Sequence, residues 1–130
     1  MTVALAHTAS GLSELVLAEA AREAAHRSSD LVVIHVSDSL DLDKREVLDT
    51  GIGEVVSRAV KDTEVAWRVE LTTGTDDIAS AILETVERVG ADVLVIGARQ
   101  RSPVGKAFLG SLSQTLILNS AVPVLVVKGR

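Results

Sequence analysis

The residues best suited to chemistry lie in one glycine- and cation-rich segment near the end of the chain. They are Gly97, Arg99, Arg101, Lys106 and Gly110. Glycines let the backbone approach a ligand closely, and the cations can form charge-assisted bonds to phosphate oxygens. The segment leads into a predicted helix start at Ser111, where free N–H groups and about half a positive charge favour an anion. The pattern predicts an anion site, although the same residues would also suit a solvated surface loop.

Two familiar phosphate loops do not fit this sequence. A Walker loop built on Gly105 and Lys106 needs glycine at position 100 and Ser or Thr at position 107, where this chain has Gln100 and Ala107. A dinucleotide fingerprint needs glycines directly after the first strand, and residues 7–10 contain none. The anion, if bound, is therefore held by a different type of loop.

Histidine is the other residue type that could act here. His7 follows the first predicted strand and is a candidate ligand contact or proton carrier. Neither a partner carboxylate nor a nucleophile is identifiable beside it, so we predict no catalytic residue. His35 is expected to pack within the second strand, and His26 falls near the end of a helix. Because the three lie on separate elements, their spacing predicts no metal site.

Composition limits the function classes. The chain has 130 residues, which corresponds to one domain, residues 1–130, and it contains no cysteine and only two aromatic residues, Trp67 and Phe108. The net charge of −5 and the scarcity of aromatic rings disfavour a nucleic-acid partner. All 18 acidic residues lie at or before Asp92, so residues 1–92 carry −10 and residues 93–130 carry +5. No apolar run is long enough for a membrane span, so we expect no membrane partner and a cytoplasmic location.

Short β-branched runs alternate with segments of helical periodicity, which predicts a parallel sheet covered by helices. The predicted strands cover residues 3–6, 31–36, 65–71, 92–96 and 122–127. The predicted helices run to about residue 27, over 41–61 with a possible break near Thr50, over 75–89, and over 111–120. We expect Thr75 to cap the third helix and Gly90 to end it, and Ser111 with Gln114 to form a capping box on the fourth.

The glycine segment and the strands around it resemble the universal stress protein family. The likeness covers the whole chain, and it is carried by residues 97–111 and by the strands Leu31–Val36, Asp92–Gly97 and Val122–Val127. The resemblance implies an α/β fold: a doubly wound, Rossmann-like, five-stranded parallel sheet of order 3-2-1-4-5 with helices on both faces, of the adenine nucleotide alpha hydrolase-like type. It also implies dimerisation, which we expect through the edge strand Val122–Val127.

Many members of the family bind ATP through the pattern G-x2-G-x9-G-[ST]. Gly97, Gly110 and Ser111 match it at the correct spacing, while Gln100 replaces the second glycine and Thr8 replaces an aspartate that usually contacts the nucleotide. A positive φ at Gln100 would cost about 1–2 kcal/mol, whereas a negative φ would let its side chain contact ribose or phosphate. The predicted binding residues are His7, Thr8, Val36, Gly97, Arg99, Gln100, Lys106, Gly110, Ser111, Leu112 and Ser113.

We therefore expect a stress-response regulatory module that binds ATP, with or without Mg²⁺, or a related adenine nucleotide, as a homodimer. The segment 97–110 has no general base or metal-binding carboxylate, so hydrolysis should be very slow if it occurs at all. The alternative from a different class is a dimeric interaction module that has lost the pocket and binds no nucleotide.

Overall fold

Strands and helices alternate along the whole chain, as the residue pattern predicts. The computed structural model describes residues 1–7, 13–37, 42–73, 77–99 and 110–129. The strands are β1 (Thr2–Ala6), β2 (Asp30–Ser37), β3 (Trp67–Thr73), β4 (Val93–Arg99) and β5 (Val124–Gly129). The helices are α1 (Ser13–His26), α2 (Leu42–Val60), α3 (Ile78–Val89) and α4 (Ser111–Asn119).

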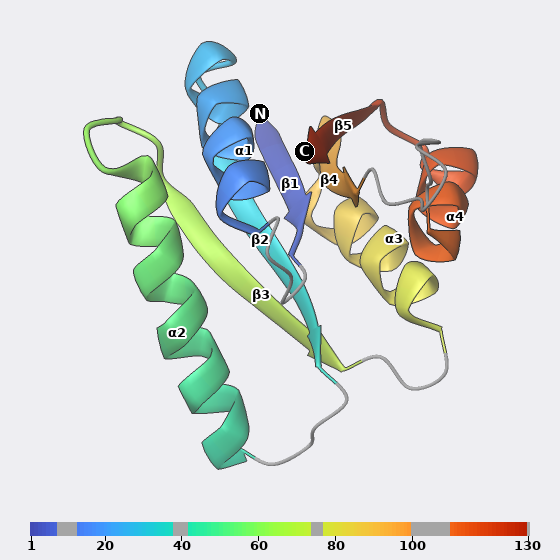
Figure 1. The fold of residues 1–130 in the computed structure, drawn as a ribbon, viewed down its shortest axis with the longest axis horizontal. Coiled ribbons are helices and arrows are strands. Elements are labelled where there is room, and N and C mark those ends of the chain that lie inside the picture. Colours follow the sequence, from blue (N-terminus) through green and yellow to red (C-terminus); the bar gives the residue numbers. More distant parts are fainter. Residues whose placement is uncertain (8–12, 38–41, 74–76, 100–109, 130) are drawn as a thin grey trace.

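The five strands form one parallel sheet in the order β3-β2-β1-β4-β5 (Figure 1). This confirms the predicted α/β fold and its strand order. On one side of β1, Ala6 is opposite Ile34 of β2, and on the other side Leu5 is opposite Val95 of β4. A parallel sheet brings the carboxyl ends of all its strands to one edge, so the candidate residues that follow β1, β2 and β4 belong to the same edge.

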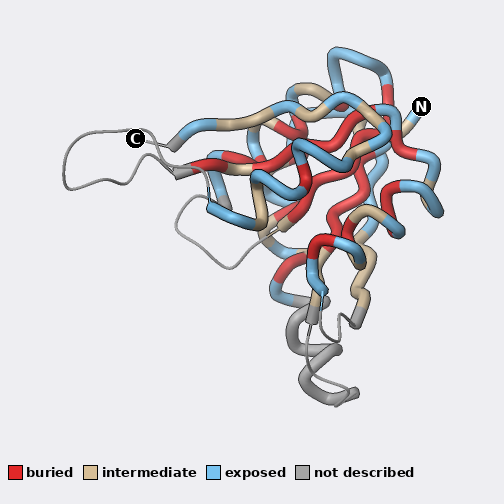
Figure 2. Tube along the Cα trace, turned by 90° about the vertical axis from the view of Figure 1, so that its right-hand side faces the viewer, coloured by how far each residue is buried: buried red, intermediate tan, exposed pale blue. Residues whose placement is uncertain are grey.

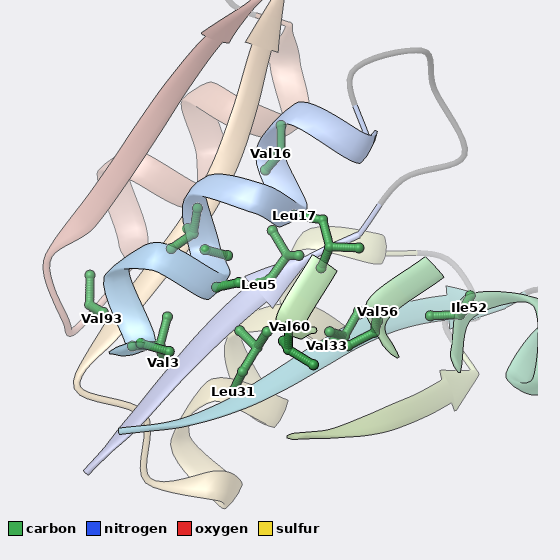
Figure 3. Packing of buried hydrophobic residues seen from close by; sticks show 14 residues of the cluster. Val3, Leu5, Val16, Leu17, Leu31, Val33, Ile52, Val56, Val60 and Val93 are labelled. Carbon is green, nitrogen blue, oxygen red and sulfur yellow. The ribbon is translucent and has the colours of Figure 1, made fainter. Parts of the chain in front are cut away.

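Two apolar layers cover the sheet, one on each face. Val3 and Leu5 of β1 pack with α1 and α2, while Ala4 and Ala6 pack with α3 and with Leu116 of α4. Figure 3 shows the first of these layers, with side chains of α1 and α2 meeting those of the strands. The central strands of the sheet, β1, β2 and β4, are the most buried part of the chain (Figure 2). Burial on both faces explains why β1 and β4 read as almost continuous apolar runs.

The helix boundaries correct two predicted caps and confirm that α2 is one helix. The cap of α3 is Asp77 and not Thr75: its carboxylate accepts hydrogen bonds from the Ser80 amide, at 3.1 Å, and from the Ser80 hydroxyl, at 2.7 Å. These bonds hold the pKa of Asp77 below its usual range. Helix α2 runs unbroken past Thr50. Gly110 and not Ser111 is the N-cap of α4, so the predicted capping box does not form.

The two outermost strands of the sheet are β3, as its alternating pattern predicts, and β5. Each of them has one side without a neighbouring strand among the described residues.

Among the described residues, no helix is both long enough and apolar enough to cross a membrane. The cytoplasmic location stays a prediction.

Gly90 ends α3 in the left-handed conformation, with φ 68° and its amide donating to the carbonyl of Glu87. An added Cβ would meet no atom within 4 Å, so the cost of a side chain there is conformational only. We expect Gly90→Ala to lower the free energy of unfolding by about 1–2 kcal/mol. The matched control is Gly51→Ala, in the interior of α2 and equally unobstructed, which should raise stability by about 0.5–1 kcal/mol. Denaturant unfolding of both variants measures the difference, and equal effects would contradict the backbone explanation.

Candidate functional site

The connections that follow β1 and β4 lead to helices on opposite faces of the sheet. Helix α1 follows β1 and packs on the face with Val3 and Leu5, whereas α4 follows β4 and packs on the face with Ala4 and Ala6. A parallel sheet opens a crevice where neighbouring strands part in this way, and ligands of such sheets bind there. The candidate site therefore lies at the carboxyl ends of β1 and β4.

The amino end of α4 contributes backbone donors to this edge. The first intrahelical bond joins the Gln114 amide to the Gly110 carbonyl at 3.0 Å, so the amides of Ser111, Leu112 and Ser113 have no acceptor within the helix. Gly110 is extended, with φ −63° and ψ 162°, and has no side chain that could cap them. A polar cap would use one of these donors internally, whereas the glycine leaves all three without a capping side chain.

A side-chain contact ties this helix start to the end of β4. The Ser113 hydroxyl donates a long hydrogen bond, 3.5 Å, to the Gly97 carbonyl. Gly97 lies within β4, opposite Val127 of β5. The start of α4, with Gly110 and Ser111 of the expected nucleotide pattern, therefore lies beside Gly97 of the same pattern.

The other predicted site residues divide into two groups. Val36 lies near the end of β2, opposite Thr72 of β3, and packs against the layer formed by α3 and α4. Thr8, Gln100 and Lys106 lie outside the described residues, and so does the side chain of Arg99, whose backbone ends β4. Their roles in binding stay predictions, and the φ of Gln100 is not tested.

Two histidines meet at the same edge. The His7 amide donates to the Ile34 carbonyl at 2.9 Å, which extends the pairing of β1 with β2 by one step and sets His7 beside His35. Their rings are tilted by 55°, with centres 5.5 Å apart and the two Nδ1 atoms 3.4 Å apart. Both rings are partly buried. Burial lowers the pKa of each imidazole below 6.5, and the charge of His35 lowers the pKa of His7 further.

Nothing in the sequence alone indicates that these two histidines form a pair. The pair depends on the register of two strands. Ala6 of β1 is opposite Ile34 of β2, and His7 and His35 are the next residue on each strand. Side chains at matched positions of neighbouring strands point to the same face and lie side by side.

The profile of the universal stress protein family matches residues 1–128 of the chain. A universal stress protein of Mycolicibacterium smegmatis is 33% identical over 106 residues, which is 82% of this chain and 81% of the relative. Its sequence and that of this chain therefore correspond over most of both lengths.

Two solved structures give the same fold. One is a universal stress protein in complex with cAMP, with a TM-score of 0.78, 20% identity, and coverage of 100% of this chain and 98% of the other. The second is the universal stress protein of Archaeoglobus fulgidus in complex with dAMP, with a TM-score of 0.72, 24% identity, and coverage of 96% and 94%.

The histidine pair makes stability depend on pH. Because each folded-state pKa lies below the ordinary value of 6.5, the unfolded chain binds more protons in that range, and stability falls as the pH drops through and below 6.5. We expect His7→Gln to reduce this loss between about pH 7.5 and about pH 5.5, since it removes one buried imidazole and the charge beside His35. The control is His26→Gln, at the exposed end of α1. Urea unfolding across the range gives the comparison, and an unchanged pH slope in His7→Gln would contradict this account.

Proposed function

The chain belongs to the universal stress protein family, and we propose that it is a stress-response regulatory module that binds an adenine nucleotide at the carboxyl edge of its sheet. ATP, alone or with Mg²⁺, is the nucleotide that the matched part of the family pattern favours. Binding would shift a conformational or partner-binding equilibrium and would not drive rapid turnover.

The observation that carries this proposal is the glycine-capped start of α4 beside Gly97. Three successive backbone amides, from Ser111 to Ser113, lack intrahelical acceptors at the positive end of the helix. A phosphate group is the ligand best suited to such donors. The basic character of residues 93–130 adds to the attraction, since this part of the chain carries five cations and no acidic residue.

The adenine part of the ligand would rest on aliphatic groups and on backbone. The chain has no aromatic residue other than Trp67 and Phe108, and Trp67 begins β3, at the opposite end of that strand from the site. Val36 is partly buried at the end of β2 and could present both its side chain and its backbone to a base. The cAMP and dAMP complexes of proteins with this fold support an adenine nucleotide as the ligand.

The competing function is an interaction module that retains the fold and binds no nucleotide. Thr8 and Gln100 favour it, because they replace an aspartate and a glycine of the family pattern. Loss of one hydrogen-bond partner from a buried group would cost about 1–3 kcal/mol of binding energy, which is enough to weaken a modest site severely. Only a binding measurement separates the two functions.

Ser111→Asp tests the site without destabilising the fold. A carboxylate in the first turn of α4 favours the helix, by about 0.3–1 kcal/mol, but repels a phosphate at the same amides. We expect calorimetric titration with Mg-ATP to show binding by the wild-type chain and an affinity at least about tenfold lower in the variant. The control is Ser57→Asp, which adds the same charge at an exposed position of α2 and should leave the affinity unchanged.

Absence of heat with wild-type protein at roughly 100 μM, on the order of a weak site's dissociation constant, would favour the interaction module. Binding that Ser111→Asp leaves intact would place the nucleotide elsewhere. Equal losses in both aspartate variants would show a general charge effect.

We propose that the module is a homodimer joined through β5. This strand is an edge of the sheet, and its outer backbone groups have no neighbouring strand among the described residues. Large apolar side chains are exposed on β5 and on the preceding helix: Leu125 is 36% exposed, Ile117 37% and Leu118 80%. Pairing with β5 of a second copy across a two-fold axis would extend the sheet and cover this apolar surface.

Leu125→Lys should shift the chain toward the monomer, since it places one charge of each copy at the two-fold interface. Leu15→Lys is the matched control, because Leu15 is similarly exposed, at 43%, on α1. Sedimentation equilibrium across a concentration series gives the dimer dissociation constant of each variant. A monomeric wild-type chain, or equal dissociation constants in the two variants, would contradict the β5 dimer.

A further inference from the structure

The histidine pair at the ends of β1 and β2 forms a site of its own. We propose that His7 and His35 bind one borderline-soft divalent cation, with Zn²⁺ the best match, through their Nδ1 atoms. His7 is also one of the predicted nucleotide contacts, but the test of the cation site does not require a nucleotide.

The backbone places both ligands without any rearrangement. The strands are held in register up to Ala6 and Ile34, and the bond from the His7 amide to the Ile34 carbonyl continues that register to the histidines. The ring centres are 5.5 Å apart while the Nδ1 atoms are 3.4 Å apart, so the Nδ1 atoms lie on the facing sides of the two rings. Two ligands on rigid neighbouring strands form a preorganised start for a metal site.

The spacing of the two nitrogens is long for a direct hydrogen bond and also suits a shared cation. Nitrogen donors and acceptors in good hydrogen bonds are about 2.7–3.2 Å apart, and this pair exceeds that range at 3.4 Å. Two nitrogen ligands of tetrahedral zinc, each about 2.0–2.1 Å from the metal, are about 3.3–3.4 Å apart. The observed distance matches the ligand spacing of a tetrahedral centre.

The chemistry of the pair also suits a metal, because a neutral imidazole offers one nitrogen lone pair to a cation. Within the described part of the chain, each ion pair joins an arginine to a glutamate, and neither histidine takes part in one. Imidazole nitrogen suits Zn²⁺, Cu²⁺ and Ni²⁺, whereas Mg²⁺ prefers oxygen ligands.

The cation would keep coordination positions open. Among the described residues, no group of three or more His, Cys, Asp or Glu side chains has the geometry of a metal site. Water or an oxygen ligand from solution would complete the tetrahedron, which is the arrangement of an open site and not of a closed structural one. Both rings are only partly buried, so the cation has access from solvent.

The test is a calorimetric titration of the full, nucleotide-free chain with ZnCl₂. We expect one Zn²⁺ per chain in the wild type and an affinity at least about tenfold lower in His7→Ala and in His35→Ala, because either change leaves a single imidazole. His26→Ala is the control: it removes an exposed imidazole from the last turn of α1 and should leave binding unchanged. MgCl₂ should give no binding at these residues.

A second readout uses the wild-type chain alone and so does not depend on the folding of the variants. Zn²⁺ should shift the Nδ1 resonances of His7 and His35 in ¹⁵N spectra and leave those of His26 in place. Substitution by Co²⁺ should give the intense visible absorption of a tetrahedral centre. Zinc binding that survives the loss of both histidines, a shift at His26 alone, or Nδ1 resonances of the pair that do not respond to Zn²⁺ would each overturn the site.

Discussion

The arrangement of the whole molecule depends on the burial of β1 between β2 and β4. Val3, Ala4 and Leu5 are almost completely buried, and their alternating directions build both apolar layers at once. A register shift of one residue on this strand would exchange the two faces, so the pairing is strongly specified. The same pairing decides which residues reach the carboxyl edge together, and the chemistry of the edge therefore follows from the packing of the core.

Two kinds of binding group meet at that edge, and they have opposite preferences. The start of α4 offers backbone donors and positive potential, which suit an anion. The pair His7 and His35 offers two imidazole nitrogens 3.4 Å apart, which suit a cation. The net charge of −5 conceals this difference, because it combines a strongly acidic body with a basic carboxyl-terminal part. From the overall charge we expect no extended nucleic-acid surface, but the charge does not argue against a local phosphate site.

Features set by local sequence were predictable, and features set by long-range pairing were not. The apolar runs predicted the strands and their class of sheet, and Gly90 predicted the end of α3. The predicted helix caps were wrong by one or two residues. Asp77 and Thr75 are both good capping residues, and Asp77 is the one that caps α3. Gly110 begins α4 without a side-chain cap. The contact between His7 and His35, 28 residues apart, requires the register of two strands, which a single sequence does not display.

Mapping ATP binding on the ¹⁵N-labelled chain by NMR would show whether an adenine nucleotide binds at the carboxyl ends of the strands beside α4. We expect the amide resonances of Gly97 and of Ser111, Leu112 and Ser113 to move together as ATP is added. Residues at the opposite edge, such as Thr63 and Gly90, should not respond. A spectrum that stays unchanged, or shifts that cluster at the opposite edge, would contradict the account.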